Sequence, residues 1–203
     1  VKSKLTGVIL AGGKSKRLGR DKALETFNGE PLILKVISSI ETLVDEIIVV
    51  VNDDKRKNDF SFMKNMTFAT DKFSDAGSLG GIYTGLHESN NLNALFLACD
   101  MPFISINILS LLINKIQLNP DIIIPEYNGF KQSTHAIYNK NCLPVIKNQL
   151  KRGEYKISKI FKKCNTLLIN EHEINQCEKD TKSFYNINYE YELEKAKQML
   201  IND

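Results

Sequence analysis

Short apolar runs alternate with amphipathic stretches along most of this chain of 203 residues. The runs favour β-branched residues, which is typical of parallel strands buried on both faces, and the stretches between them carry apolar residues at helical spacing. We expect strands over residues 7–10, 46–51, 67–70, 93–98, 122–124, 135–138 and 165–170. We expect helices over residues 31–43, 81–88, 106–116, 143–150 and 190–201, and a polar loop over residues 52–57. The alternation predicts one domain, residues 1–203, of the α/β class: a doubly wound, mostly parallel, Rossmann-like sheet with helices on both faces.

The composition argues against several classes of protein. The net charge of +3 and the 25 % of charged residues are ordinary, so we expect no nucleic-acid partner. No apolar run approaches the roughly 20 residues that cross a bilayer, so we expect no membrane contact and a cytoplasmic location. The four cysteines form no C-x-x-C pair, which argues against a zinc site or a disulfide framework. Cys99 is expected to be a small buried residue at a strand end rather than a nucleophile.

The first predicted strand ends in two adjacent glycines, Gly12 and Gly13. A group of cations follows at once: Lys14, Lys16, Arg17 and Lys22. Glycines let backbone N–H groups approach an anion closely, so this loop predicts a site for a polyphosphate. The P-loop is excluded because its first glycine would fall on Val8, and the G-x-G-x-x-G pattern fails as well. The alternative is an ordinary surface turn with solvated cations.

Polar residues follow three further predicted strands. Asn52, Asp71 and Asp100 each lie just beyond the end of a predicted strand. Because the carboxyl ends of parallel strands meet at one edge of a sheet, we expect these side chains to share a crevice with the glycine loop. Asp100 is a candidate Mg²⁺ ligand, since this ion prefers oxygen and bridges a carboxylate to phosphates. The alternatives are a helix N-cap for Asp100 and a turn residue for Asn52.

The pattern L-A-G-G-x-S-x-R-L-G-x-D-K over residues 10–22 resembles the signature loop of the molybdenum cofactor guanylyltransferase family. The resemblance implies a nucleotidyltransferase fold and a Mg²⁺-dependent transfer of GMP from GTP to molybdopterin, with release of pyrophosphate. Relatives that use CTP resemble L-A-A-G here, so Gly12 favours guanine. The implied nucleotide-binding residues are Leu10, Ala11, Gly12, Gly13, Lys22, Asn52, Asp71, Gly77, Gly80 and Asp100. Among them, Asn52 and Asp71 are expected to contact the base and ribose.

Fixed positive charges, together with a metal ion, are sufficient to stabilise the transition state of the implied nucleotidyl transfer. Attack of a substrate phosphate on the α-phosphorus builds negative charge on the equatorial oxygens and on the departing pyrophosphate. We expect Lys22 to reach the α-phosphate and Arg17 the β/γ end, while Asp100 holds the metal. Lys14 and Lys16 are supporting or solvated charges. The catalytic set is therefore Arg17, Lys22 and Asp100.

Two later segments bear on the second substrate and on the base. The segment around Asn186 and Asn188 resembles the family's N-x-N-T-P-E pattern, although Tyr189 and Glu190 replace Thr-Pro. We expect the two asparagines to face the pterin. Residues 77–81 are expected to form a second glycine loop, where the family usually has Gly-Pro-Leu and Ser78 stands in place of the proline. The alternative is a plain β-to-α turn. His135, inside an apolar strand, is expected to be a core residue with satisfied hydrogen bonds.

Three alternative functions remain at this stage. The protein could use CTP on molybdopterin, activate a sugar or alcohol phosphate, or be a non-catalytic nucleotide-binding regulator. The presence of Arg17, Lys22 and Asp100 together argues against the regulator. Transient contact with other cofactor-biosynthesis or molybdoenzyme-delivery proteins is also expected from the resemblance.

Overall fold

The computed structural model describes residues 4–12, 20–63 and 66–201. Its main sheet has the strand order β10-β7-β9-β6-β1-β4-β5, with β8 paired to β7. The strands are β1 (Leu5–Leu10), β4 (Glu46–Val51), β5 (Thr67–Thr70), β6 (Asn93–Ala98), β7 (Ile122–Tyr127), β8 (Phe130–Lys131), β9 (His135–Asn139) and β10 (Thr166–Ile169). All neighbouring strands run parallel except β9, which is antiparallel to β6 and β7, and the short β8. The predicted doubly wound, mostly parallel sheet is confirmed.

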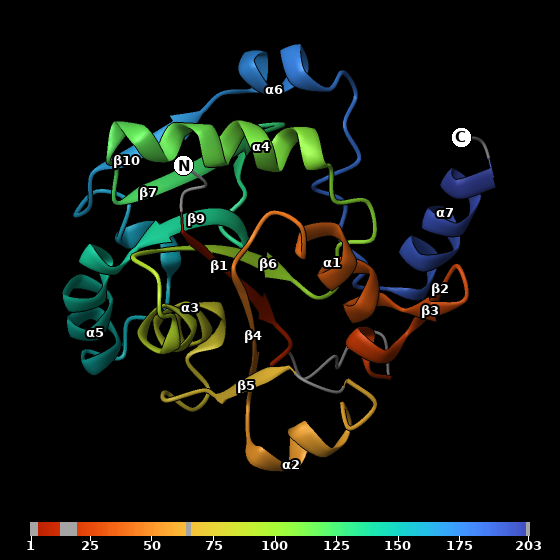
Figure 1. Cartoon of the computed structure of the whole chain (residues 1–203), viewed down its shortest axis with the longest axis horizontal. Helices are drawn as coiled ribbons and strands as arrows, with labels where there is room; N and C mark the ends of the chain where they lie inside the picture. The colour runs from red at the N-terminus through yellow and green to blue at the C-terminus, as the bar shows by residue number, and fades with distance from the viewer. Residues whose placement is uncertain (1–3, 13–19, 64–65, 202–203) are drawn as a thin grey trace.

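Helices cover both faces of the sheet (Figure 1). One face carries α1 (Leu32–Ile40), α4 (Ile106–Asn114) and α6 (Glu171–Cys177), and the other carries α3 (Gly77–Glu88) and α5 (Leu143–Lys151). Because successive side chains of a strand point to opposite faces, each strand contributes to two hydrophobic cores, one on each face of the sheet. In β6, Leu95 and Leu97 pack in the core beneath α1 and α4, and Phe96 packs in the core beneath α3 and α5.

A smaller apolar cluster lies beside the main sheet. It joins a hairpin of β2 (Thr26–Phe27) and β3 (Glu30–Pro31) to α7 (Glu190–Ile201), through Phe27, Ile187 and Leu193. The remaining elements are α2 (Asp54–Asn58) and the 3-10 turns η1 (Lys22–Leu24), η2 (Lys115–Leu118), η3 (Lys140–Cys142) and η4 (Ile157–Lys159). The turn η1, which begins at Lys22, packs instead on the core beneath α1 and α4, through Ala23 and Leu24.

Two segments that the sequence predicts as loops are helical. The polar stretch after β4 forms α2, because the Asp53 carboxylate accepts the Arg56 backbone N–H at 3.0 Å and caps the helix. The expected glycine loop at residues 77–81 is instead the first turn of α3, which begins at Gly77. The strand expected at residues 122–124 also continues through Pro125, whose carbonyl accepts the Gln132 N–H at 2.9 Å.

Small residues bring α3 directly against β1. A Cβ at Gly81 would lie 2.9 Å from Leu10 Cδ2, and a Cβ at Gly85 would lie 2.5 Å from Val8 Cγ1. Both distances are too short for a side chain, so the glycines permit this close packing. The N-terminal end of α3 is thereby held at the carboxyl edge of the sheet. Within the described residues, no helix has the length and apolar character needed to cross a membrane.

Candidate active site

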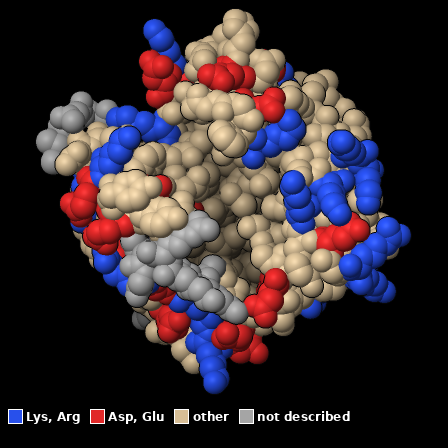
Figure 2. Space-filling model, turned by 180° about the vertical axis from the view of Figure 1, so that it is seen from behind, with Lys and Arg blue, Asp and Glu red and all other residues tan. Residues whose placement is uncertain are grey.

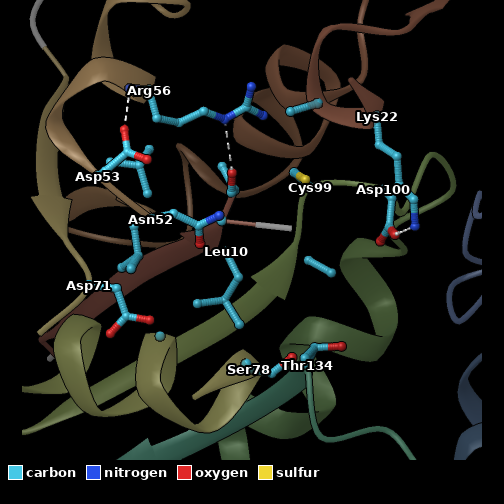
Figure 3. Close-up of a pocket in the computed structure, with 18 of the residues that line it drawn as sticks. Leu10, Lys22, Asn52, Asp53, Arg56, Asp71, Ser78, Cys99, Asp100 and Thr134 are labelled. Carbon is cyan, nitrogen blue, oxygen red and sulfur yellow. Dashed lines mark hydrogen bonds and ion pairs between the residues drawn. The ribbon is translucent and has the colours of Figure 1, made fainter. Parts of the chain in front are cut away.

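A cavity of about 540 Å³ opens at the carboxyl ends of β1, β4, β5 and β6. Figure 2 shows a deep hollow on one face of the molecule, with charged side chains around its rim. The cavity is lined by most of the residues singled out from the sequence: Leu10, Ala11, Gly12, Lys22, Asn52, Asp71, Gly77 and Asp100. Asn52 and Asp71 lie on one side, and Lys22 and Asp100 lie on the other (Figure 3). The arrangement suits an elongated ligand with a polar head at one end and an anionic group at the other.

Lys22 and Asp100 come together from distant parts of the chain. Lys22 Nζ lies 3.2 Å from Asp100 Oδ2 and donates to Asn188 Oδ1 at 2.6 Å. The backbone N–H of Ile187 also donates to the Asp100 carbonyl at 2.9 Å, which ties the segment before α7 to the end of β6. A cation, a carboxylate and an amide from three segments therefore meet at one wall of the cavity.

Asp100 lines the cavity with a largely buried carboxylate. Its side chain is 14 % exposed, and its Oδ1 is buried and bonds to no other residue in the described part of the chain. Burial raises the pKa of this carboxyl above its usual range, while the Lys22 ammonium lowers it. No group of three acidic, histidine or cysteine side chains in the described residues could hold a metal by itself. One carboxylate with a free oxygen suits Mg²⁺, which takes one or two carboxylates and completes its shell with phosphates and water.

At the opposite wall, Gly12 and Asn52 are in close contact. A Cβ at Gly12 would lie 2.4 Å from Asn52 Oδ1, so the amide of Asn52 occupies the space that an alanine would need. Asp71 is fixed by a second set of contacts: its Oδ1 accepts the Phe73 N–H and the Thr84 hydroxyl, both at 3.0 Å. Burial raises the pKa of Asp71. The Asp71 carboxylate is therefore oriented by contacts within the protein.

The remaining predicted residues fall into three groups. Gly77 lines the cavity at the start of α3, whereas Gly80 supports it from behind, since a Cβ there would lie 2.9 Å from Asp71 Oδ2. Asn188 reaches Lys22, but Asn186 turns to its own segment and donates to the Phe184 carbonyl at 3.0 Å. Gly13 and Arg17, with Lys14 and Lys16, lie outside the described residues.

Two residues could be mistaken for reactive groups: His135 is fully buried, whereas Cys99, expected to be buried, is only partly so and lines the cavity. Burial raises the pKa of the Cys99 thiol, which keeps it protonated and argues against a nucleophile. Burial lowers the pKa of His135 to about 3, and the neutral ring packs edge-on against Phe184. The expectation of satisfied hydrogen bonds at His135 is wrong within the described residues, where neither ring nitrogen has a partner.

Sequence reasoning missed Arg56 and passed over Asp21, which both line the cavity. Arg56 lies in the charged run that was predicted to be a polar loop, and its partner Asp21 is 35 positions away in the sequence. The available signal was its position just after the end of β4, where the neighbouring strands also place functional groups.

A doubly wound sheet with a cation, a carboxylate and a ligand-sized cavity at its carboxyl edge defines a nucleotide-binding α/β protein. Residues 7–168 match the sequence profile of the MobA-like NTP transferase domain. The chain therefore belongs to the MobA-like NTP transferase family, and it is an enzyme of the nucleotidyltransferase class.

Several known proteins are similar over nearly their whole length. A probable molybdenum cofactor guanylyltransferase of Natranaerobius thermophilus is 36 % identical, and the match covers 97 % of this chain and 96 % of the relative. A molybdenum cofactor guanylyltransferase of Desulfosudis oleivorans is 33 % identical over 95 % and 94 % of the two chains. The crystal structure of molybdopterin-guanine dinucleotide biosynthesis protein A from Archaeoglobus fulgidus has the same fold, with a TM-score of 0.87 at 23 % identity, covering 98 % and 100 % of the chains.

Proposed function

We propose that this protein transfers GMP from GTP to molybdopterin and releases pyrophosphate, with Mg²⁺ as its metal. The observation that carries the proposal is the pairing of Lys22 with Asp100, whose buried Oδ1 has no hydrogen-bond partner among the residues that the structure describes. The names of the similar proteins support the choice of GTP and of the pterin acceptor. The buried, unpartnered carboxylate oxygen supports the choice of Mg²⁺.

In the proposed reaction, a phosphate oxygen of the acceptor attacks the α-phosphorus of GTP. The bond from the α-phosphorus to the oxygen that bridges to the β-phosphate breaks, and pyrophosphate leaves with the electron pair. Lys22 stabilises the charge that develops on the α-phosphate, and Asp100 would hold a Mg²⁺ ion that would supply further positive charge there. The acceptor is already an anion, so the step needs no general base.

The other residues hold the two substrates. Asn52 and Asp71, on the wall opposite Lys22, contact the base and ribose in this proposal. Leu10, Ala11, Gly12 and Gly77 provide the backbone and apolar surface around the nucleotide. Asn188, which bonds to Lys22, is the proposed contact of the pterin acceptor. Arg17 remains the expected contact of the β/γ phosphates.

The test is product formation by the purified protein with Mg²⁺ and molybdopterin, offered GTP or CTP in parallel. Pyrophosphate release and product mass are measured, with EDTA as the control for the metal. A guanine dinucleotide formed only with GTP and Mg²⁺ is the expected result. A cytosine product would overturn the base, undiminished turnover in EDTA would overturn the metal, and no product with either nucleotide would overturn the acceptor.

The base choice can be tested at Gly12. Alanine at this position would place a methyl group 2.4 Å from Asn52 Oδ1 and force that side chain to move. Overpacking of this kind costs about 1–3 kcal/mol. We therefore expect Gly12→Ala to lower kcat/KM for GTP by about 5- to 150-fold.

The matched control is the pair of variants Asn52→Ala and Gly12→Ala/Asn52→Ala, measured with GTP and CTP. Without the Asn52 amide there is nothing to collide with, so the added methyl group should have little further effect. Equal additional losses in both backgrounds would show that Gly12 acts independently of Asn52.

A further inference from the structure

A single side chain contacts both the start and the end of the segment that joins β1 to η1. Arg56 Nε lies 3.5 Å from the Ala11 carbonyl, and the Arg56 guanidinium forms a two-pronged ion pair with the Asp21 carboxylate, with one of the two contacts at 2.6 Å. Arg56 comes from α2, which follows a different strand. Figure 3 shows this side chain extended from α2 across one end of the cavity.

The guanidinium is held on several sides. Its NH1 group donates to Asp59 Oδ2 at 3.1 Å, and its carbon lies 4.8 Å from the centre of the buried Phe60 ring. The Arg56 side chain is 17 % exposed. The bond to Asp21 is the largest of the effects that raise the pKa of Arg56, so the guanidinium keeps its charge. A planar fork matched to a carboxylate is a geometry that lysine cannot reproduce.

Asp21 connects this contact to the candidate active site. Asp21 Oδ1 accepts the Ala23 N–H at 3.0 Å and so caps η1, whose first residue is Lys22. The same oxygen accepts the 2.6 Å bond from Arg56. An arginine that fixes the capping carboxylate therefore fixes the backbone from which Lys22 extends toward Asp100.

We propose that Arg56 is a positioning residue: by holding Ala11 and Asp21 together, it sets the backbone at Lys22 in the orientation that the transfer step requires. This inference rests on the proposed function, because it assigns Lys22 the charge that acts in the transition state. Arg56 itself acts through Asp21, since both of its terminal nitrogens are engaged with that carboxylate.

Loss of this contact should affect turnover more than binding. A misplacement of about 1 Å at the reacting group can cost about a hundredfold in rate. We expect Arg56→Ala to lower kcat about 10- to 100-fold while the KM for GTP changes less than about threefold. Arg56→Lys keeps the charge but loses the fork, so it should recover only part of kcat. The matched control is Lys57→Ala, which removes an exposed 2.7 Å ion pair with Asp54 on the same helix and should leave kcat unchanged.

A double-mutant cycle separates positioning from direct contact with the nucleotide. If Arg56 acts through Asp21, the variant Arg56→Ala/Asp21→Ala should be no slower than Asp21→Ala alone. Multiplied losses, or a KM for GTP that rises while kcat holds, would instead make Arg56 a substrate ligand and overturn the proposal. An unchanged kcat in Arg56→Ala would also overturn it.

Hydrogen exchange gives a readout that needs no turnover. The Ala23 amide, which is protected by Asp21, should exchange faster in Arg56→Ala than in the wild type or in Lys57→Ala, at a temperature where all three are folded. If the wild type turns over no nucleotide, the proposed function fails, and the exchange result alone decides whether Arg56 holds this turn. Unchanged exchange at Ala23 would overturn the inference even in an active enzyme.

Discussion

Replacing Lys22 by alanine is expected to lower kcat by roughly two to four orders of magnitude, which is the usual cost of removing one preorganised charge from a transition state. The Lys22 side chain is 15 % exposed, and its ammonium is held between Asp100 and Asn188. A cation fixed before the substrate arrives needs no reorganisation during the reaction. The loss should therefore appear in kcat at saturating GTP rather than in KM.

The measurement is steady-state release of pyrophosphate at saturating Mg²⁺, GTP and molybdopterin. Lys22→Met keeps most of the side chain without the charge, and it should be as slow as Lys22→Ala. Lys72→Ala is the matched control, because Lys72 is 41 % exposed and pairs with Glu88 on the surface. A decrease of less than about threefold in Lys22→Ala would mean that another group supplies the charge.

The strands were predictable because a buried parallel strand appears in the sequence as a short run of apolar, often β-branched residues. The strands at Glu46–Val51, Thr67–Thr70 and Asn93–Ala98 agree with their predicted bounds. Glu46–Val51 and Asn93–Ala98 are short apolar runs that reflect burial on both faces, whereas Thr67–Thr70 is a half-buried strand at the edge of the sheet. Since parallel strands end at one edge, the same pattern led to Asn52, Asp71 and Asp100, which all line the cavity.

The errors arose where a local signal has two structural outcomes. A polar run after a strand suits a loop, but Asp53 at its start caps a helical turn, so residues 54–58 are helical. The glycines at residues 80 and 81 suggested a flexible loop. They lie instead in α3, where the absence of a side chain lets the helix pack closely against Asp71 and Leu10. In the first case an N-cap residue determines the helix, and in the second case the packing partner comes from another strand of the fold.

Contacts between distant residues could not be predicted from one sequence. Nothing near Arg56 indicates that it pairs with Asp21, and nothing near Asn188 indicates that it rather than Asn186 reaches Lys22. The local sequence pattern locates the strand ends, and so it identifies which residues lie at the carboxyl edge of the sheet. The packing of α2 and of the segment before α7 decides which of them meet.

Asp100 provides the second large effect: Asp100→Ala is expected to abolish Mg²⁺-dependent turnover while the protein stays folded. The variant removes the candidate metal ligand and leaves Lys22 bonded to Asn188. The Mg²⁺ dependence of GTP binding should disappear along with turnover. Full activity in this variant would remove Asp100 from the metal site, and circular dichroism with a thermal melt checks the fold.

Asp100→Asn sharpens the test because it changes the charge but hardly the shape. Burial raises the pKa of Asp100, so the folded state binds this proton more strongly than the unfolded state does. Above the folded pKa, the ionised carboxylate therefore reduces the stability of the folded protein, and this penalty is relieved as the pH falls through that value. We expect Asp100→Asn to lose turnover yet to melt no lower than the wild type at neutral pH. A much lower melting temperature would show that the ion pair with Lys22 outweighs the cost of burial, and that Asp100 serves the fold as well as the metal.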